Sequence, residues 1–279
     1  MKRIVAGILS LFLVCSAYAD NLRGLHTVVI DAGHGGHDSG AVSRDNKTLE
    51  KDLTLDIARK LAARIDAVYP DVKVILTRDS DTFVSLSDRA EIANKNGANL
   101  FISIHINASP KSTPCGYSVH VLGQSHDKDR DLFANNMDVV QRENAVMMLE
   151  DDYTTKYADF NPDDARSFIF LALMQNANLE ASLDFANTIV TKMKKGPVSV
   201  NRGISQDPFY VLWKTSMPAV LCELGFISNY EEVCKLRDEN NRNELAEILF
   251  ESFREYKAKY DGSVSYEQPA QQVDSTLQK

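Results

Sequence analysis

The sequence predicts a single α/β domain with a mainly parallel sheet, helices on both faces and a partly helical insertion. Short apolar runs rich in β-branched residues alternate with amphipathic helical patterns, as is typical of parallel strands joined by crossover helices. Three of these runs end on a residue that can bind a metal or carry a proton, namely His34, His105 and Glu223. Open α/β sheets bind their ligands at the carboxyl ends of the strands, so we expect a functional site there.

The expected elements follow in chain order. The first strand is the run VVID from Val28, which leads to His34 between glycines that let the backbone turn sharply. Apolar residues then recur every four positions from Leu49 to Ile65, which predicts a helix that ends before Pro70. The other expected strands are 72–77, 99–105, 119–122, 210–213 and 219–221, and the other expected helices are 87–96, 179–193 and 245–256.

Both ends of the chain are expected to lie outside the domain, which spans 25–260. Residues 1–19 combine a basic start, an apolar segment and the small-residue sequence AYA, which together indicate a cleaved secretory signal peptide. The apolar segment is too short to span a bilayer, so no stable membrane anchor is expected. A lipoprotein anchored through Cys15 is the alternative. Residues 261–279 are polar and without periodicity, which predicts a disordered tail.

Charge and cysteine content exclude one class of function. The chain has a formal net charge of −8, and loss of Lys2 and Arg3 with the signal peptide leaves 29 basic against 39 acidic residues, or −10. Such an acidic protein is a poor nucleic-acid binder, because that binding depends on Lys and Arg neutralising phosphates. Cys115, Cys222 and Cys234 remain, and their odd number favours free buried thiols over a bridge between the last two.

Residues 124–179 interrupt the alternation of strands and helices. This segment is longer, more polar and partly helical, and its apolar residues suffice to pack one helix on the body but not to form a separate core. We therefore expect an insertion in the domain, not a second domain.

The polar residues at the strand ends suggest metal chemistry. His34 and His105 end separate strands and Glu50 begins the first helix, and two imidazoles with one carboxylate form a ligand set of catalytic zinc with an open fourth position. Zinc lowers the pKa of bound water to about 7. A second carboxylate, for which Glu223 is the candidate, is then needed to carry the proton to the leaving nitrogen. Each residue alone has a structural explanation, and only their joint occurrence indicates a metal hydrolase.

Six motifs carry the inference further: IDAGHGG at 30–36, EKDL at 50–53, TRD at 77–79, LSDR at 86–89, SIHINA at 103–108 and PAVLCELGFISN at 218–229. In this order they resemble the zinc-dependent N-acetylmuramoyl-L-alanine amidases of the cell-wall hydrolase type, over roughly 26–258. The resemblance implies an α/β fold with a mixed, mostly parallel sheet and one Zn²⁺ held by His34, Glu50 and His105, with Glu223 as the catalytic glutamate. It also implies cleavage of the amide between N-acetylmuramic acid and L-alanine in peptidoglycan.

Three further residues are weaker candidates for substrate binding. Asn107 follows a candidate ligand and is close enough in sequence to contact substrate. Arg78 and Arg89 either contact peptide carboxylates or hold the loops of the site through structural salt bridges.

The insertion is similar to an extra segment in amidases used during cell separation. In those enzymes a helix covers the active site, and an acidic side chain occupies the open zinc position until a protein activator displaces it. The candidates for such an inhibitory acid are Glu143, Glu150, Asp151 and Asp152, and the sequence singles out none of them. A plain structural insertion and a substrate-contacting lid are the alternatives.

The leading hypothesis is thus an exported peptidoglycan amidase, with the periplasm as the expected compartment and an extracellular or lipoprotein-anchored form as alternatives. A zinc peptidase that cuts within the stem peptide is the second hypothesis. The third is a non-catalytic wall-binding regulator on an amidase scaffold, whose mark would be loss of a key residue, yet His34, Glu50, His105 and Glu223 are all present.

Overall fold

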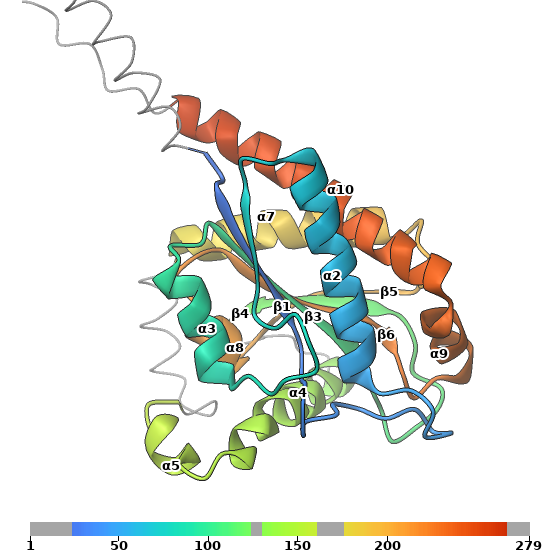
Figure 1. Ribbon diagram of the computed structural model, residues 1–279. Helices are drawn as coiled ribbons and strands as arrows, with labels where there is room; N and C mark the ends of the chain where they lie inside the picture. Colours follow the sequence, from blue (N-terminus) through green and yellow to red (C-terminus); the bar gives the residue numbers. More distant parts are fainter. Residues whose placement is uncertain (1–23, 124–129, 161–175, 267–279) are drawn as a thin grey trace, which may run out of the picture.

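The computed structural model describes residues 24–123, 130–160 and 176–266 (Figure 1). They contain a six-stranded sheet with the order β2-β1-β3-β6-β4-β5. Neighbouring strands are parallel except β4 and β6, which are antiparallel. The mixed, mostly parallel sheet in a single α/β domain is therefore confirmed.

The strands are β1 (Thr27–Ala32), β2 (Lys73–Leu76), β3 (Leu100–Asn107), β4 (Tyr117–Leu122), β5 (Asn201–Asp207) and β6 (Ala219–Phe226). The helices are α2 (Glu50–Val68), α3 (Leu86–Lys95), α4 (Arg130–Asn144), α5 (Tyr153–Lys156), α7 (Asn176–Met193), α8 (Tyr210–Trp213), α9 (Tyr230–Arg237) and α10 (Glu239–Tyr266). A 3₁₀ helix, η1 (Ala145–Leu149), follows α4.

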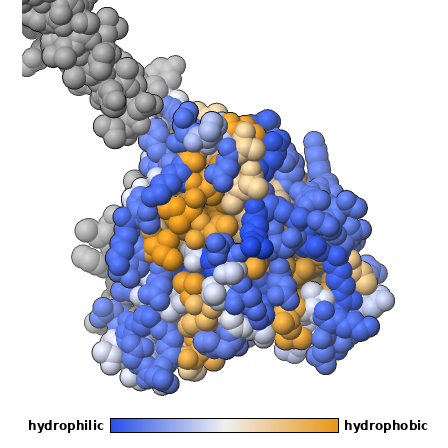
Figure 2. All heavy atoms as spheres, in the orientation of Figure 1, coloured by the Kyte–Doolittle hydropathy of each residue, from blue (hydrophilic) through white to orange (hydrophobic). Residues whose placement is uncertain are grey.

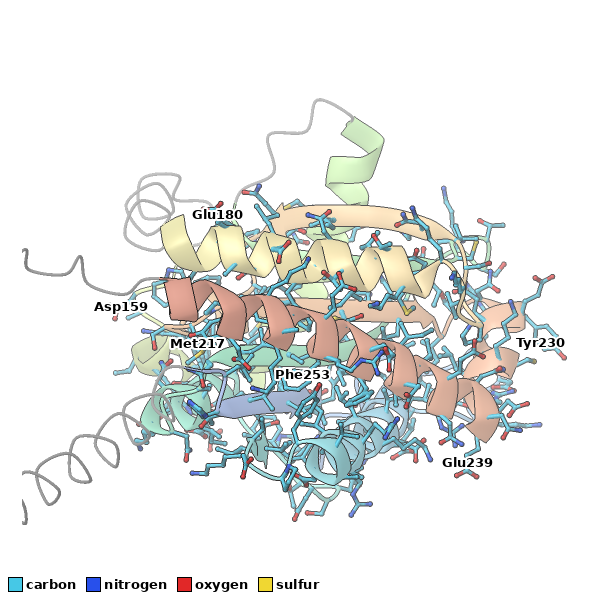
Figure 3. All side chains as sticks on the ribbon, turned by 90° about the horizontal axis from the view of Figure 1, so that it is seen from above. Asp159, Glu180, Met217, Tyr230, Glu239 and Phe253 are labelled. Carbon is cyan, nitrogen blue, oxygen red and sulfur yellow. The ribbon has the colours of Figure 1, made fainter. Side chains whose placement is uncertain are left out.

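Alternate residues of the strands enter two cores on opposite faces of the sheet. Val28 and Ile102 belong to the larger core, which α2, α7 and α10 cover, and α7 and α10 lie side by side across this face (Figure 3). Val29 and Phe101 point to the other face, where α3, α4 and α8 pack. Because both faces are covered, the central strands are mostly apolar up to their carboxyl ends, as the sequence indicated.

The face seen in Figure 2 is mostly hydrophilic, with an apolar area near the sheet edge at which β2 lies. Val74, Ile75 and Leu76 of this strand are only half-buried. An edge strand pairs on one side only, so its residues keep part of their surface exposed.

Two elements differ from the sequence prediction. Residues 210–213, expected as a strand, form the helical turn α8, in which Tyr210, Val211 and Leu212 are all buried. Periodicity cannot separate a buried strand from a buried helical turn in so short an apolar run. The prediction also missed β5, because an edge strand of sequence NRGISQD has no apolar run to reveal it.

Helix α10 continues to Tyr266, into the segment expected as a disordered tail. That part of the expectation is wrong, whereas 267–279 and the expected signal peptide at 1–19 lie outside the described residues. In the described part of the chain no helix combines the length and apolarity needed to cross a bilayer. Cys115, Cys222 and Cys234 are unpaired, as expected, but only Cys222 is buried.

Candidate active site

The candidate site lies at the carboxyl ends of β1, β3 and β6. His34 follows β1, while His105 and Glu223 are opposite each other in the register of β3 and β6, so their side chains leave the same face of the sheet. Glu50 begins α2 and is fully buried. The fold thus brings together the four residues that the sequence singled out.

The loop after β1 packs closely against the second imidazole. A Cβ on Gly33 would lie 2.5 Å from Cε1 of His105, so this position requires glycine. His34 has a φ of 63°, a left-handed conformation that is uncommon for other residues than glycine and that clusters at functional sites. Its Nδ1–H donates to Oδ2 of Asp38 at 2.8 Å, which sets the tautomer and leaves the lone pair of Nε2 for the site.

Two buried arginines hold this loop in place. Nη2 of Arg78 donates to the backbone oxygen of Gly33 at 2.8 Å. Arg89 donates through Nη2 to the backbone oxygen of His34 and through Nη1 to Oδ1 of Asp31, both at 2.7 Å. These contacts are those of the loop-holding role that the sequence left open beside substrate contact.

A fourth residue, Glu143 of α4, joins the two histidines and Glu50. Its Oε2 lies 3.1 Å from Nε2 of His34 and 3.0 Å from Nδ1 of His105. Oε1 of Glu50 lies 3.2 Å from Nε2 of His34 and 3.3 Å from Nδ1 of His105. All four ligand atoms lie within 4.8 Å of one another and all four residues are buried, so they form a group that can hold a metal ion.

The geometry of this group fits a tetrahedral metal. Ligand bonds of 2.0–2.1 Å place neighbouring ligand atoms of tetrahedral zinc about 3.3 Å apart, close to the separations seen here. Nε2 of His34 and Oε2 of Glu143 are buried and close, yet neither makes a hydrogen bond of acceptable geometry. These two atoms point toward a shared position between the ligands and not toward each other. The donor set of imidazole nitrogens and carboxylate oxygens is one that zinc prefers.

The charges of the group are strongly coupled. Burial opposes ionisation of Glu50, but the charge of His34 and the hydrogen bonds of both imidazoles together outweigh it, and the pKa of Glu50 falls to about 2. Burial likewise disfavours the charged form of His105, but Glu143 and Glu50 raise its pKa to about 9. The two buried carboxylates therefore face two protonated imidazoles. In the metal-bound protein, the cation would replace these protons.

Glu223 lies beside this group without a ligand's contacts. It is fully buried, and neither carboxylate oxygen has a hydrogen-bond partner in the described part of the chain. Burial and the charge of Glu143 raise the pKa of Glu223 to about 8, although Arg142 acts in the opposite direction. A carboxyl group that titrates near neutral pH is suited to accept and return a proton.

Of the four acids proposed in the insertion, only Glu143 reaches the site. Glu150 pairs instead with Lys156, whose Nζ lies 2.6 Å from its Oε2. Asp151 and Asp152 are exposed. These three acids follow the last turn of α4, so the helix that carries Glu143 into the site does not carry them.

Helical spacing is the signal that would have singled out Glu143. Val139 and Val140 are buried, and Glu143 follows them by four and three residues on the same face of α4. A glutamate on the buried face of an amphipathic helix needs a partner. Arg142 was not predicted from the sequence; its Nη2 lies 2.7 Å from Oε1 of Glu143, and its Nη1 donates to Oδ1 of Asn107 at 3.3 Å.

An α/β sheet that gathers buried histidines and carboxylates at its carboxyl edge, next to a carboxyl group poised for proton transfer, is typical of metal-dependent hydrolases. The sequence comparison gives the family. The family profile of N-acetylmuramoyl-L-alanine amidases matches residues 28–254, and the chain belongs to this family.

Individual relatives carry the same name. The chain is 33% identical to the amidase AmiA of Escherichia coli K12 over 87% of this chain and 80% of that protein. It is 32% identical to AmiC of Escherichia coli O6:H1, over 83% of this chain and 52% of that protein. The chain thus spans about half the length of AmiC and of AmiB from Haemophilus influenzae.

Solved structures agree with the fold. An N-acetylmuramoyl-L-alanine amidase from Clostridium difficile 630 aligns with a TM-score of 0.61 and 28% identity, over 84% of this chain and 97% of that one. The CwlD amidase from Clostridioides difficile, solved in complex with the GerS lipoprotein, aligns with a TM-score of 0.61 and 25% identity, over 84% and 99% of the two chains.

Proposed function

We propose that this protein is a zinc-dependent peptidoglycan hydrolase that cleaves the amide between N-acetylmuramic acid and the L-alanine of the stem peptide. The observation that carries the proposal is the convergence of His34, Glu50 and His105 beside Glu223, whose carboxylate oxygens accept no hydrogen bond from the described residues. Membership of the amidase family supports the substrate and the bond. These residues would hold zinc, which would supply Lewis-acid polarisation of the substrate carbonyl and a water of lowered pKa.

Other residues of the site orient the ligands and transfer the proton. Asp38 keeps the proton of His34 on Nδ1, so that Nε2 is a ligand in the correct tautomer. The backbone N–H of Ile106 donates to Oε1 of Glu50 at 2.8 Å and fixes that carboxylate. A carboxylate oxygen of Glu223 takes the proton of the attacking water and returns it to the nitrogen of the leaving alanine.

We further propose that α4 inhibits the enzyme. Oε2 of Glu143 faces both imidazoles and would fill the ligand position that a catalytic water needs. Arg142 anchors the helix, because its Nη1 donates to the backbone oxygen of Ala108 at 2.9 Å and its Nη2 lies 3.6 Å from Oε1 of Glu223. The helix therefore covers both the metal position and the proton carrier.

Activation then requires that α4 moves away, and a protein partner is the simplest agent. The CwlD amidase, which shares this fold, has been solved with a lipoprotein bound, which supports a protein partner here. The signal-peptide pattern of residues 1–19 supports export, with the periplasm as the place of action.

Mass spectrometry of digestion products tests the activity. Zinc-loaded Glu143→Ala protein incubated with purified peptidoglycan is expected to release stem peptides that begin with L-alanine, and the Glu143→Ala/Glu223→Ala double variant is expected to release none. Glu150→Ala is the matched control, because Glu150 is an acid of the same segment that lies outside the site. Shortened stem peptides still attached to sugar would instead indicate a peptidase.

A further inference from the structure

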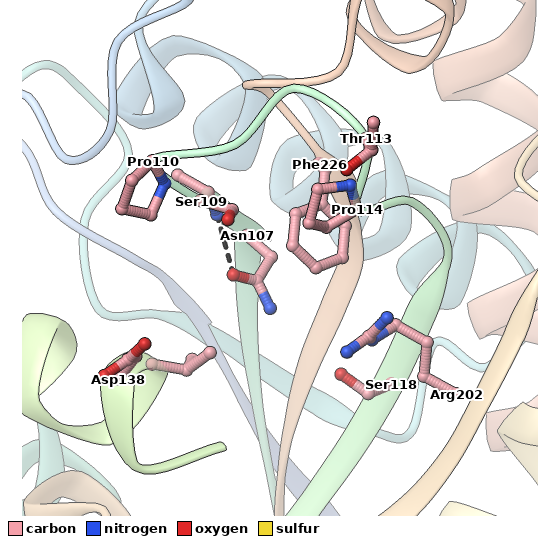
Figure 4. Close-up of a pocket in the computed structure, with 11 residues that line it drawn as sticks. Asn107, Ser109, Pro110, Thr113, Pro114, Ser118, Asp138, Arg202 and Phe226 are labelled. Carbon is pink, nitrogen blue, oxygen red and sulfur yellow. Dashed lines mark hydrogen bonds between the residues drawn. The ribbon is translucent and has the colours of Figure 1, made fainter. Parts of the chain in front are cut away.

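A pocket of about 230 Å³ opens next to Glu223, between the loop after β3, helix α4 and strand β5 (Figure 4). It is not part of the metal group described above. Its polar lining includes Asn107, Ser118 and Arg202, and Phe226 forms an apolar wall. In Figure 4, Ser118 and Arg202 lie on one side of the pocket and Asp138 of α4 on the other.

The sheet register places this pocket in line with the catalytic residues. His105 is opposite Glu223, and Glu223 is opposite Ser118 on β4. The pairing of β4 with β5 shifts here, because Tyr117 pairs with Asn201 but Val119 pairs with Ile204.

Two residues of β5, Arg202 and Gly203, therefore lie opposite the single residue Ser118. Gly203 has a φ of +90°, and its N–H donates to Oδ1 of Asn201 at 2.8 Å. Bulges of this kind change the direction of a side chain and are common next to active sites. The bulge turns Arg202 into the pocket at the end of the row that begins with the metal ligand.

The guanidinium of Arg202 has no carboxylate partner in the described part of the chain. Its Cζ stacks 5.2 Å from the ring centroid of Phe226, and no described carboxylate oxygen lies within the 4.0 Å that defines a salt bridge. Glu232 is near enough for its pKa to respond to Arg202, but its two oxygens already accept backbone N–H groups from Gly116 and Phe226, each at 2.7 Å.

Two other polar groups of the pocket already have partners within the protein. The hydroxyl of Ser118 bonds Nε2 of His120 at 2.9 Å, and Nδ1 of that histidine bonds Asp207 at 2.6 Å. Oδ1 of Asn107 accepts the backbone N–H of Ala108 at 2.7 Å. Arg202 is thus the group of this pocket best placed to bind an anion, and a guanidinium stacked on an aromatic ring is well suited to bind a carboxylate with two hydrogen bonds.

We propose that Arg202 binds a carboxylate of the stem peptide and so sets the specificity for the peptide side of the scissile bond. This inference rests on the proposed function. The sugar side of the bond offers only neutral amide and hydroxyl groups, whereas the peptide side carries the acids. The residue after L-alanine is joined through its side-chain carboxyl group and keeps a free α-carboxylate, and a diacid in the third position adds another.

Distances favour the nearer of these carboxylates. Two strand spacings separate β6 from β5, or about 10 Å, and an extended peptide covers roughly 7 Å in two residues. A carboxylate on the second residue is therefore within reach of an arginine side chain when the scissile amide lies beside Glu223. Asp138 on the opposite wall repels a carboxylate while α4 is docked, so we expect binding after α4 has moved.

Steady-state kinetics of the zinc-loaded Glu143→Ala protein on soluble muramoyl tripeptides test the proposal. The first substrate pair has either the α-carboxylate or its amide on the second residue, and the second pair has either diaminopimelate or lysine in the third position. We expect Arg202→Gln to raise KM for the α-carboxylate substrate roughly 10- to 100-fold with little change in kcat. The amide substrate should be almost unaffected, and Arg202→Lys should restore part of the loss.

Controls separate this role from a structural one. Arg64→Gln, which removes an arginine that pairs with Glu247 away from the pocket, should change neither substrate pair. If Arg202→Gln raised KM equally for the acid and amide substrates, the proposal would be overturned. Equal cleavage of both substrates by the Glu143→Ala protein with Arg202 intact would also overturn it. A discrimination that appears only in the second pair would move the recognised carboxylate to the third residue.

A measurement of peptide binding tests the role of Arg202 even when no substrate is cleaved. If the Glu143→Ala protein with Arg202 intact cleaves no substrate, the proposed function fails. Calorimetric titration of the zinc-loaded Glu143→Ala/Glu223→Gln protein with acid and amide peptides still tests Arg202, because it needs no turnover. Tighter binding of the acid that is lost in Arg202→Gln supports the assignment, and equal binding of both peptides contradicts it.

Discussion

The metal cradle and the helix that covers it are held to the protein in different ways. The cradle, formed by the loop around His34 with Glu50 and His105, lies on a buried polar network. The carboxylate of Asp31 at its base accepts hydrogen bonds from Thr77, Ser103 and Arg89, each at 2.7 Å. Removing Ser103 would leave Oδ2 of the buried Asp31 without its hydrogen-bond donor, and Oδ1 is held by two donors, so the cradle is expected to be rigid.

The described last two turns of helix α4 are attached to the body by fewer buried contacts. In the part whose side chains are described, Val139 and Val140 are its buried apolar residues. Nδ2 of Asn144 donates to the backbone oxygen of Pro208 at 3.0 Å, and Arg142 bonds the loop after β3. Oδ1 of Asn144 accepts the backbone N–H of Tyr210 at 3.0 Å, and Glu143 faces the two imidazoles. This difference suggests a permanent catalytic cradle under a cover that can be displaced, and the predictions below test the two parts separately.

The largest effect is expected in the cradle. His105→Ala removes a ligand and should reduce bound zinc from one per chain to nearly none, with complete loss of activity. Metal content by mass spectrometry after dialysis provides the measurement. His120→Ala is the matched control, because this buried histidine bonds Ser118 and Asp207 outside the cradle. Full zinc occupancy in His105→Ala would contradict the assigned ligand set.

Loss of the proton carrier is expected to be nearly as severe but to spare the metal. Glu223→Gln keeps the size of the side chain and removes its basicity, so turnover in the Glu143→Ala background should fall roughly 10²- to 10⁴-fold. Zinc content should stay at one per chain. Retained turnover in this variant would show that another group moves the proton.

A moderate effect on activity is expected from a change in helix α4, which covers the site. Arg142→Gln removes the partner of Glu143 and the bond to Ala108, so α4 should release more often. Activity should rise above that of the wild type by roughly 10- to 100-fold, the value of a charged hydrogen bond. Gln141→Ala changes the exposed neighbour of the same helix and should have little effect. Reduced activity in Arg142→Gln would mean that α4 assists catalysis.

The smallest effect concerns stability and pH in the metal-free protein. The pKa of Glu223 is raised to about 8 from the usual glutamate value of 4.5, mainly by burial. As pH rises from 4.5 to 8 the unfolded chain loses this proton while the folded protein keeps it, so folding becomes less favourable across that window. Glu223→Gln should therefore raise the melting temperature by a few degrees at pH 8 and hardly at all at pH 4.5. An equal shift at both pH values would contradict the raised pKa.

The same division explains what the sequence could predict. His34, His105 and Glu223 follow or end apolar strands, and parallel strands place such residues together by topology alone. The fold class and the cradle were predictable for that reason. Glu143 was one of four equal candidates, because its position depends on how α4 docks and on the burial of one helical face.

Arg202 was not predicted at all. It lies on a polar edge strand that has no apolar run, and a bulge in the pairing with β4 sets its direction. Such a shift of register arises from strand pairing in the folded sheet. The strand assigned to 210–213 was wrong for a related reason, because tertiary packing and not the local pattern makes Tyr210–Trp213 helical.

The central claim is that α4 can leave the site while the cradle keeps the metal. The most direct test is Glu143→Ala, with zinc content and turnover measured on the same preparation. We predict one zinc per chain and a clear rise in peptidoglycan amidase activity, since His34, Glu50 and His105 hold the metal without Glu143. Loss of both zinc and activity would show instead that Glu143 is a permanent ligand, and α4 would then belong to the cradle.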